Sequence, residues 1–293
     1  MGVNPALIRQ YVKNGRLTRV CRGYYVRATD EWQWPEDRHR VLVKAQARSV
    51  AEKTVFSHES AASVHGLPLF GANLSTFRTT IPSDSRGSKS SSSRVTHFAP
   101  LGQDDVVIID GIPVTSVART VADLARTRHR DLVVCLADSA LNRKLCTLEE
   151  IDVALRNPPS RYGLPRARHS RLYFRSASES VAESWSRLIM SDAAIPTPEL
   201  QRRISCPSGQ VYRVDFLWEE HGVIGECDGM DKYFGDTARH EARQRLRLEK
   251  DRENTLQAMG FTVVRWTWSD LSTPQLFVNR VRSALEARGP RRS

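Results

Sequence analysis

Three acidic residues stand on two neighbouring predicted strands in the C-terminal third of the sequence. Glu226 and Asp228 are two residues apart, so the alternation of a β-strand puts both carboxylates on one face. Asp215 precedes them across a short hairpin and can reach the same place. Carboxylates gathered in this way repel one another and raise each other's pKa, and a divalent cation relieves the repulsion. Oxygen ligands with open positions suit Mg²⁺ or Mn²⁺, which can polarise a phosphate and activate water for phosphodiester cleavage.

Basic residues and glycines flank the three acids. A helix predicted at 238–259 is rich in arginine, and Arg243, Arg247 and Lys250 are candidates to hold a nucleic-acid backbone. Gly225 and Gly229 border the acidic pair and are expected to leave the backbone open to a ligand. The alternative is an ordinary strand pair whose acids face water or pair with these arginines.

The acids must be positioned by the strands and helices predicted around them in the C-terminal region. Strands are predicted at 211–218, 223–228 and 261–266, and helices at 178–191, 238–259 and 274–287. Together they predict an α/β domain with a mixed sheet flanked by helices.

The N-terminal residues 1–30 carry a second concentration of positive charge. A short helix at 5–14 is followed by two short strands, with Arg22-Gly23 at the turn, which outlines part of a winged helix. Such a helix enters the major groove of DNA while the wing follows the phosphates. The alternative is a solvated basic face. The candidate DNA contacts are Arg9, Lys13 and Arg16 around the helix, and Arg19 and Arg22 on the wing.

The composition agrees with a polyanionic partner. The chain has 293 residues, enough for about two domains, and 44 Lys and Arg against 33 Asp and Glu give a net charge of +11. No apolar stretch is long enough to cross a membrane, and the first residues do not form a secretory signal. Five cysteines without a Cys-x-x-Cys pair favour a reduced, cytoplasmic protein over a disulfide framework or a zinc ribbon.

The middle residues 31–155 predict a further mixed α/β region. A strand pattern at 104–114 turns at Asp110-Gly111, and a capped helix follows at 116–124. The segment 83–93 is expected to be a mobile basic loop, 156–176 a basic linker rich in proline and glycine, and 289–293 a basic tail. Four polar residues of this region are a candidate catalytic cluster, although a structural role with caps and an Arg–Asp pair is favoured: His58, Glu59, Arg119 and Asp123.

The C-terminal region resembles the DUF559 family, in the very-short-patch-repair-like branch of the PD-(D/E)xK nuclease superfamily. The matching residues are Val214-Asp215-Phe216, Gly225-Glu226-Cys227-Asp228-Gly229, Glu249-Lys250-Asp251-Arg252-Glu253 and Val263-Val264-Arg265-Trp266-Thr267-Trp268, within a domain expected at 177–288. The resemblance implies that Asp215 and Glu226 are metal ligands and that Glu183 adds a carboxylate from a helix. Asp228 stands where the superfamily has its strand lysine, and two other residues are candidates to replace that cation, Lys232 and Lys250.

The N-terminal and middle regions resemble AbiEi-type antitoxin proteins. The matching residues are Gly15-Arg16-Leu17-Thr18-Arg19-Val20, Arg22-Gly23-Tyr24-Tyr25-Val26 and Ser57-His58-Glu59-Ser60-Ala61-Ala62. The family's winged helix has one or two helices before its recognition helix, so residues 1–30 correspond to a partial winged helix.

Two functions follow as alternatives. One is a DNA-binding, Mg²⁺- or Mn²⁺-dependent endonuclease. The other is an antitoxin-like transcriptional regulator with a cognate toxin and an inactive nuclease-like domain.

Overall fold

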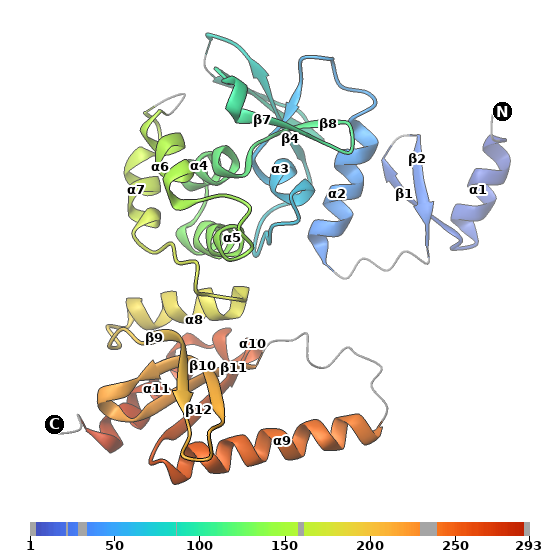
Figure 1. Ribbon diagram of the computed structural model, residues 1–293. Coiled ribbons are helices and arrows are strands. Elements are labelled where there is room, and N and C mark those ends of the chain that lie inside the picture. The colour runs from blue at the N-terminus through green and yellow to red at the C-terminus, as the bar shows by residue number, and fades with distance from the viewer. Residues whose placement is uncertain are drawn as a thin grey trace. The chain divides into compact units, whose positions relative to one another are not determined.

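The computed structural model describes residues 4–21, 23–28, 34–85, 87–157, 161–228 and 239–289, with side chains in the last range from residue 248 onward. The chain divides into two compact units, residues 1–172 and 173–293. Each unit combines helices with β-sheet, which confirms the predicted α/β class (Figure 1).

The first unit begins with the predicted helix and hairpin. Asn4 caps helix α1 (Pro5–Lys13) by accepting a hydrogen bond from the backbone N–H of Ala6, and Pro5 occupies the first turn, where its missing N–H costs nothing. Strands β1 (Leu17–Cys21) and β2 (Tyr24–Arg27) pair antiparallel, followed by helix α2 (Pro35–Gln46). No residue of α1 is buried, so its side chains are available to a partner.

A six-stranded mixed sheet forms the centre of the first unit. Its order is β5-β6-β4-β3-β8-β7, with β3 parallel to β8 and β4 parallel to β6. The strands are β3 (Val55–Phe56), β4 (Phe77–Pro82), β5 (Gly87–Ser90), β6 (Arg94–Ala99), β7 (Val106–Ile109) and β8 (Ile112–Thr115). The predicted turn at Asp110-Gly111 joins β7 to β8, and both residues take positive φ angles that Asp and Gly tolerate.

The expectation of a mobile loop at 83–93 is wrong for part of that segment. Residues 87–90 form β5, an exposed edge strand that pairs antiparallel with β6. Main-chain hydrogen bonding to a neighbouring strand does not depend on side-chain type, so the serine-rich composition did not reveal this strand.

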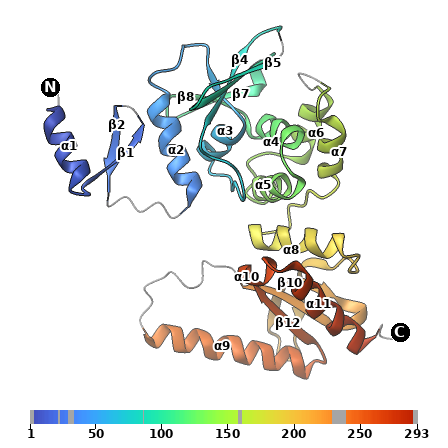
Figure 2. The ribbon, with the colours of Figure 1, turned by 180° about the vertical axis from the view of Figure 1, so that it is seen from behind.

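Helices cover the sheet and build the rest of the first unit (Figure 2). Helix α3 (His58–Val64) contacts β4 and β8, and the apolar core there joins Val43 of α2 to Phe56, Phe77 and Val114 of the strands. The remaining helices are α4 (Val117–Thr127), α5 (Arg130–Asn142), α6 (Leu148–Arg156) and α7 (Leu164–Arg171). Helix α4 confirms the predicted capped helix, since the Ser116 hydroxyl accepts from the backbone N–H of Arg119 at 3.5 Å.

Helix α7 corrects the predicted linker at 156–176. It packs against α4 and α5 with Ala167 and Ser170 buried, so residues up to 172 belong to the first unit. Gly163 precedes it with φ +73°, and a Cβ there would lie 2.1 Å from the Arg126 carbonyl oxygen. Pro165 fits the first helical turn. The glycine and the proline therefore start a helix here rather than prevent one.

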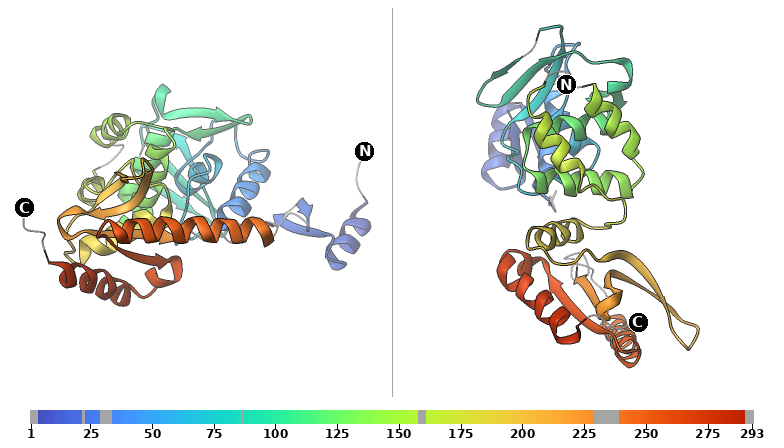
Figure 3. Two further views of the ribbon diagram at one scale, coloured as in Figure 1. Left: turned by 60° about the horizontal axis from the view of Figure 1, so that its bottom comes forward. Right: turned by 90° about the vertical axis from the view of Figure 1, so that its left-hand side faces the viewer.

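The second unit is a four-stranded mixed sheet in the order β12-β11-β10-β9, flanked by helices (Figure 3). Strands β10 (Val211–Trp218), β11 (Val223–Asp228) and β12 (Thr262–Thr267) confirm the prediction, as do α8 (Val181–Asp192), α9 (Arg239–Ala258) and α11 (Pro274–Arg288). Two elements were not predicted, strand β9 (Glu199–Ser205) and the short helix α10 (Trp268–Leu271). Strands β9, β10 and β11 are antiparallel neighbours, whereas β11 and β12 are parallel.

The two faces of this sheet carry separate cores. On one face Phe216, Trp218, Cys227 and Trp266 pack with residues of α8, α10 and α11. On the other face Val214, Leu217 and Ile224 pack with Leu256 of α9. A helix that could cross a membrane, with the required length and apolar character, does not occur in the part of the chain that the structure describes.

Candidate active site

The predicted acids gather on the second unit's sheet, beside α9. Glu226 is two residues from Ile224, which faces α9, and Arg252 of α9 contacts it. Glu226 and Asp228 share one face as predicted, since the Arg265 guanidinium lies 4.0 Å from Glu226 Oε2 and 3.7 Å from Asp228 Oδ1. Strand alternation therefore placed these carboxylates correctly.

Asp215 connects two parts of the site through hydrogen bonds. Its Oδ2 accepts the backbone N–H of Cys227 at 2.9 Å, which ties β10 to β11 just beyond their paired residues. Its Oδ1 accepts from the Gln201 amide at 3.3 Å, and the same nitrogen donates to Glu183 Oε2 at 3.0 Å. One amide thus bridges the strand carboxylate and the helix carboxylate that the resemblance implied.

Gln201 was not predicted as a site residue. It lies on β9 with φ +52°, an uncommon backbone conformation for a residue other than glycine. Strain of this kind is kept where the surrounding contacts require it. Here the contacts are the carboxylates of Glu183 and Asp215, so the local backbone of β9 is adapted to the acidic cluster.

Glu183 is fixed at the start of α8. It is the third residue after the N-cap Ser180, whose hydroxyl donates to Glu183 Oε1 at 2.9 Å, while Oε2 accepts the backbone N–H of Glu179 at 2.9 Å. Burial raises the pKa of Glu183, and the charge of Asp215 raises it further. The capping arrangement holds the carboxylate in one orientation.

Glu226 is buried and pairs with an arginine of α9. Arg252 Nη2 donates to Glu226 Oε1 at 2.5 Å and also to the Arg213 carbonyl oxygen at 2.7 Å. Burial raises the pKa of Glu226 to about 7, and the carboxylates of Asp215 and Asp228 raise it while Arg252 and Arg265 lower it. This carboxyl therefore gains or loses its proton near neutral pH.

Arg265 is a second cation within the acidic cluster. It stands opposite Glu226 in the parallel register of β11 and β12. Besides Glu226 and Asp228 it contacts Glu249 and Glu253 of α9, the latter at 3.6 Å. Among the described side chains, four carboxylates contact the guanidinium groups of Arg252 and Arg265, and the charge of Asp215 acts on Glu226, so the described acids outnumber these two cations.

Other predicted residues are only partly described. Lys232, Arg22 and the side chains of Arg243 and Arg247 lie outside the described part of the chain. Lys250 is exposed on α9. The four remaining basic candidates of the N-terminal region are all exposed: Arg9, Lys13, Arg16 and Arg19. Their exposure is what contact with a nucleic acid requires.

Gly225 has a different role from the one expected. It is buried, and a Cβ there would lie 2.5 Å from Trp266 Cη2 and 3.1 Å from Phe216 Cβ. The glycine lets two aromatic rings pack under the strand that carries Glu226, rather than opening the backbone to a ligand. Gly229 lies outside the described residues.

We expect Gly225→Ala to lower the free energy of unfolding of the second unit by about 1–3 kcal/mol, as overpacking of a core does. Denaturant unfolding followed by tryptophan fluorescence reports on this unit, which holds Trp266 and three more of the six tryptophans. Gly102→Ala is the control, since the nearest atom to its Cβ is 3.6 Å away. An unchanged midpoint for Gly225→Ala would show that the rings move aside without penalty.

The polar cluster of the first unit forms buried ion pairs. Asp123 accepts from Arg119 Nε at 3.2 and 3.1 Å and also pairs with Arg126, and Arg119 Nη1 lies 2.7 Å from Asp105. The Arg–Asp pair of the structural interpretation is therefore present. His58 stacks on the ring of His97 at 4.2 Å between centroids, and burial lowers the pKa of both.

No family model matches the chain. It is 31% identical over 156 residues to uncharacterized proteins MT2308 and Rv2248 of two Mycobacterium tuberculosis strains, CDC 1551 / Oshkosh and H37Rv. The match covers 53% of this chain and 55% of each relative, so the chain spans about half the length of the curated relatives it matches.

The acidic cluster has the donor chemistry of a Mg²⁺ or Mn²⁺ site, but its oxygens have other partners. Among the side chains that the structure describes, no three His, Cys, Asp or Glu residues are grouped closely enough to hold a metal ion. Glu226 instead contacts Arg252, and Asp215 contacts Gln201 and the Cys227 backbone. The guanidinium group and the metal would compete for the Glu226 carboxylate.

Proposed function

We propose that residues 173–293 form a metal-dependent endonuclease domain that nicks or cleaves DNA, joined to a DNA-binding N-terminal element. The observation that carries this proposal is the excess of carboxylates around Glu226, fixed on two strands and linked to Glu183 by Gln201. Hard oxygen donors in such excess favour a divalent cation. The mixed sheet between α8, α9 and α11 agrees with the nuclease resemblance.

In this proposal the protein residues have distinct tasks. Asp215, Glu226 and Asp228 would hold Mg²⁺ or Mn²⁺ in competition with Arg252, and the bound ion would polarise the scissile phosphate and lower the pKa of water. Gln201 orients Asp215 and Glu183 through one amide nitrogen. Lys232 is the proposed cation beside the leaving group. Arg243, Arg247 and Lys250 of α9, with the basic residues of the N-terminal element, are proposed to hold the DNA backbone.

The direct test is incubation of the full-length protein with supercoiled plasmid and single-stranded DNA, with Mg²⁺ or Mn²⁺ and with a chelator as control. Metal-dependent nicking is expected. Asp215→Ala removes both a proposed ligand and the link to Gln201, so it is expected to abolish the activity. An Asp215→Ala protein that cuts as well as the wild type would refute the assignment.

Binding of the metal is expected to depend on pH. Glu226 has a raised pKa of about 7, so below that pH the carboxyl is mostly protonated in the folded protein and the metal must displace the proton. Mn²⁺ affinity measured by calorimetry is therefore expected to be about tenfold weaker at pH 6 than at pH 8. Equal affinity at the two pH values would show that Glu226 is not a ligand.

A specific contact favours a second candidate function, that of an antitoxin-like regulator that binds DNA without cutting it. Arg252 neutralises the Glu226 carboxylate, as a cation does in a site that no longer binds metal. In this case the protein acts in the cytoplasm on its own promoter, with a cognate toxin as partner. Salt-dependent gel shifts that prefer the promoter over random DNA, without Mn²⁺ binding, would support the regulator over the nuclease.

A further inference from the structure

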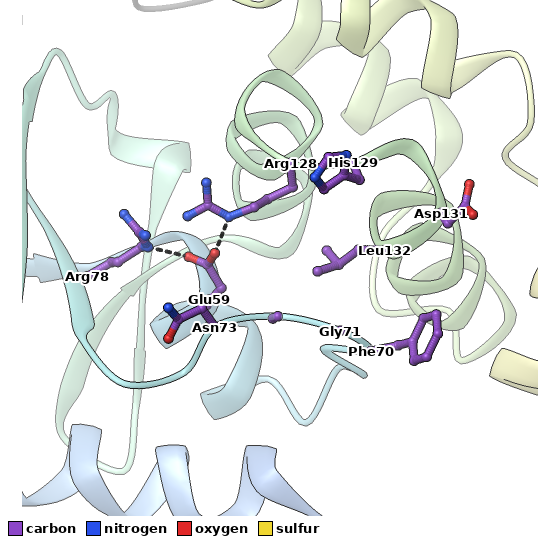
Figure 4. Close-up of a pocket in the computed structure, with 10 residues that line it drawn as sticks. Glu59, Phe70, Gly71, Asn73, Arg78, Arg128, His129, Asp131 and Leu132 are labelled. Carbon is purple, nitrogen blue, oxygen red and sulfur yellow. Dashed lines mark hydrogen bonds and ion pairs between the residues drawn. The ribbon is translucent and has the colours of Figure 1, made fainter. Parts of the chain in front are cut away.

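A pocket of about 450 Å³ lies in the first unit. It is formed by the chain that follows α3, by β4 and by the start of α5 (Figure 4). Its polar lining includes Glu59, Arg78 and Arg128, and its apolar lining includes Phe70 and Leu132. A volume of this size is typical of small-molecule sites.

The pocket carries more positive than negative charge. Glu59 is only 1% exposed, and the Nε atoms of Arg78 and Arg128 contact its two carboxylate oxygens, the first at 2.6 Å. Figure 4 shows the two guanidinium groups approaching this carboxylate from different elements. One carboxylate balances only one guanidinium. The other acid in the lining, Asp131, already accepts from Arg130 Nε at 3.0 Å.

The guanidinium groups keep unused hydrogen-bonding capacity. Both contact Glu59 through Nε, which leaves their terminal nitrogens for other acceptors. Arg128 uses Nη1 for the Thr127 carbonyl oxygen, whereas in the described part of the chain neither Nη of Arg78 makes a hydrogen bond. Burial lowers the pKa of Arg78, and the nearby charge of Arg128 also lowers it, which an anion would reverse.

The rest of the lining favours an apolar body next to the charged group. Phe70 and Leu132 lie on the opposite side of the pocket from Arg78 in Figure 4, and Ala72 adds a small apolar side chain. Guanidinium groups match the geometry of carboxylate and phosphate oxygens, and aromatic and aliphatic walls bind planar or apolar groups.

We propose that this pocket binds a small organic anion, with its carboxylate or phosphate at Arg78 and Arg128 and its apolar body against Phe70 and Leu132. The site belongs to the first unit and does not depend on whether the second unit cleaves DNA. It would give a DNA-binding protein a means of responding to a small molecule.

The test is calorimetric titration of the full-length protein with benzoate and with phenyl phosphate, with neutral benzamide and inorganic phosphate as comparison probes. Saturable binding of at least one of the two aromatic anions is expected at concentrations up to about 10 mM. Stronger binding of benzoate would indicate a carboxylate ligand, and stronger binding of phenyl phosphate a phosphate ester. Equal binding of benzamide would contradict the role of charge, and equal binding of inorganic phosphate would contradict the role of the apolar wall.

Substitutions test whether the aromatic anions bind in this pocket. Arg78→Met and Arg128→Met are each expected to weaken binding at least tenfold, whereas Arg94→Met, an exposed residue outside the pocket, leaves it unchanged. Because Arg78 and Arg128 also hold the buried Glu59, Ala72→Phe is a second test that fills the pocket and leaves both ion pairs in place. Failure of both aromatic anions to bind the wild type, or unchanged binding by Ala72→Phe, would overturn the proposal.

Discussion

Replacing Glu226 with Gln is expected to weaken Mn²⁺ binding at least 100-fold and to remove metal-dependent DNA cleavage. Outer-shell partners of a metal site already contribute 10–100-fold to affinity or activity, and Glu226 is proposed as a direct ligand. The amide cannot supply a negative charge. Its shape is close to that of the carboxylate, so the packing around Arg252 and Arg265 is retained. Calorimetric titration with Mn²⁺ measures this effect without knowledge of the correct DNA substrate.

The matched control for Glu226→Gln is Glu220→Gln, the same chemical change at an exposed acid in the turn between β10 and β11. This control is expected to bind Mn²⁺ as the wild type does. If Glu226→Gln also binds normally, the metal is held elsewhere. If the wild-type protein itself binds no Mn²⁺ at pH 8, Arg252 is the permanent partner of Glu226 and the regulator is the better description.

The sequence predicted those parts of the site that depend on local alternation. Glu226 and Asp228 lie on one face because they are two residues apart on a strand, and Asp215 returns to them across a hairpin. Glu183 was predicted as a site residue only from the resemblance to the nuclease superfamily, although its position three residues after Ser180 is a local capping signal.

The missing parts of the site depend on contacts between distant segments. Strand β9 has exposed Arg202 and Arg203 in its centre, so its pattern did not indicate a strand, and Gln201 was missed with it. Arg265 lies in a recognised strand, but its contact with Glu226 requires the parallel register of β11 and β12. Arg252 lies on the arginine-rich helix predicted at 238–259, and its contact with Glu226 fits the alternative in which the acids pair with these arginines, although no local pattern indicated which arginine.

The sequence did not predict the pocket of the first unit either, because its residues also come from segments that are distant in the sequence. Glu59 was recognised as a polar residue on a helix, but Arg78 and Arg128 come from a strand and an interhelical turn far along the chain. The balance between the Glu59 carboxylate and the two guanidinium groups depends on the folded structure and not on any local sequence pattern. Sequence patterns therefore predicted the elements well and the electrostatic partners poorly.

Replacing Asp123 with Ala is expected to lower the local free energy of unfolding of α4 by about 3–5 kcal/mol. The carboxylate is buried and pairs with Arg119 and Arg126, which are themselves only 5% and 9% exposed at their side chains. Removing one member of a buried ion pair leaves an uncompensated buried charge, which is far more costly than losing a surface pair. Hydrogen exchange of the α4 amides measures the effect, and we expect exchange to be faster by a factor of at least 100.

Asp152→Ala is the control that separates the effect of burial on stability from the effect of losing an ion pair. Asp152 also receives two hydrogen bonds from one arginine, Arg171, at 2.6 and 2.7 Å, but the two side chains are about a quarter exposed. Its loss is expected to change stability by no more than about 1 kcal/mol. If Asp123→Ala and Asp152→Ala lower stability equally, burial does not determine the loss of stability. If Asp123→Ala keeps full protection of α4 but changes DNA binding or cleavage, the cluster of Arg119 and Asp123 serves function rather than structure.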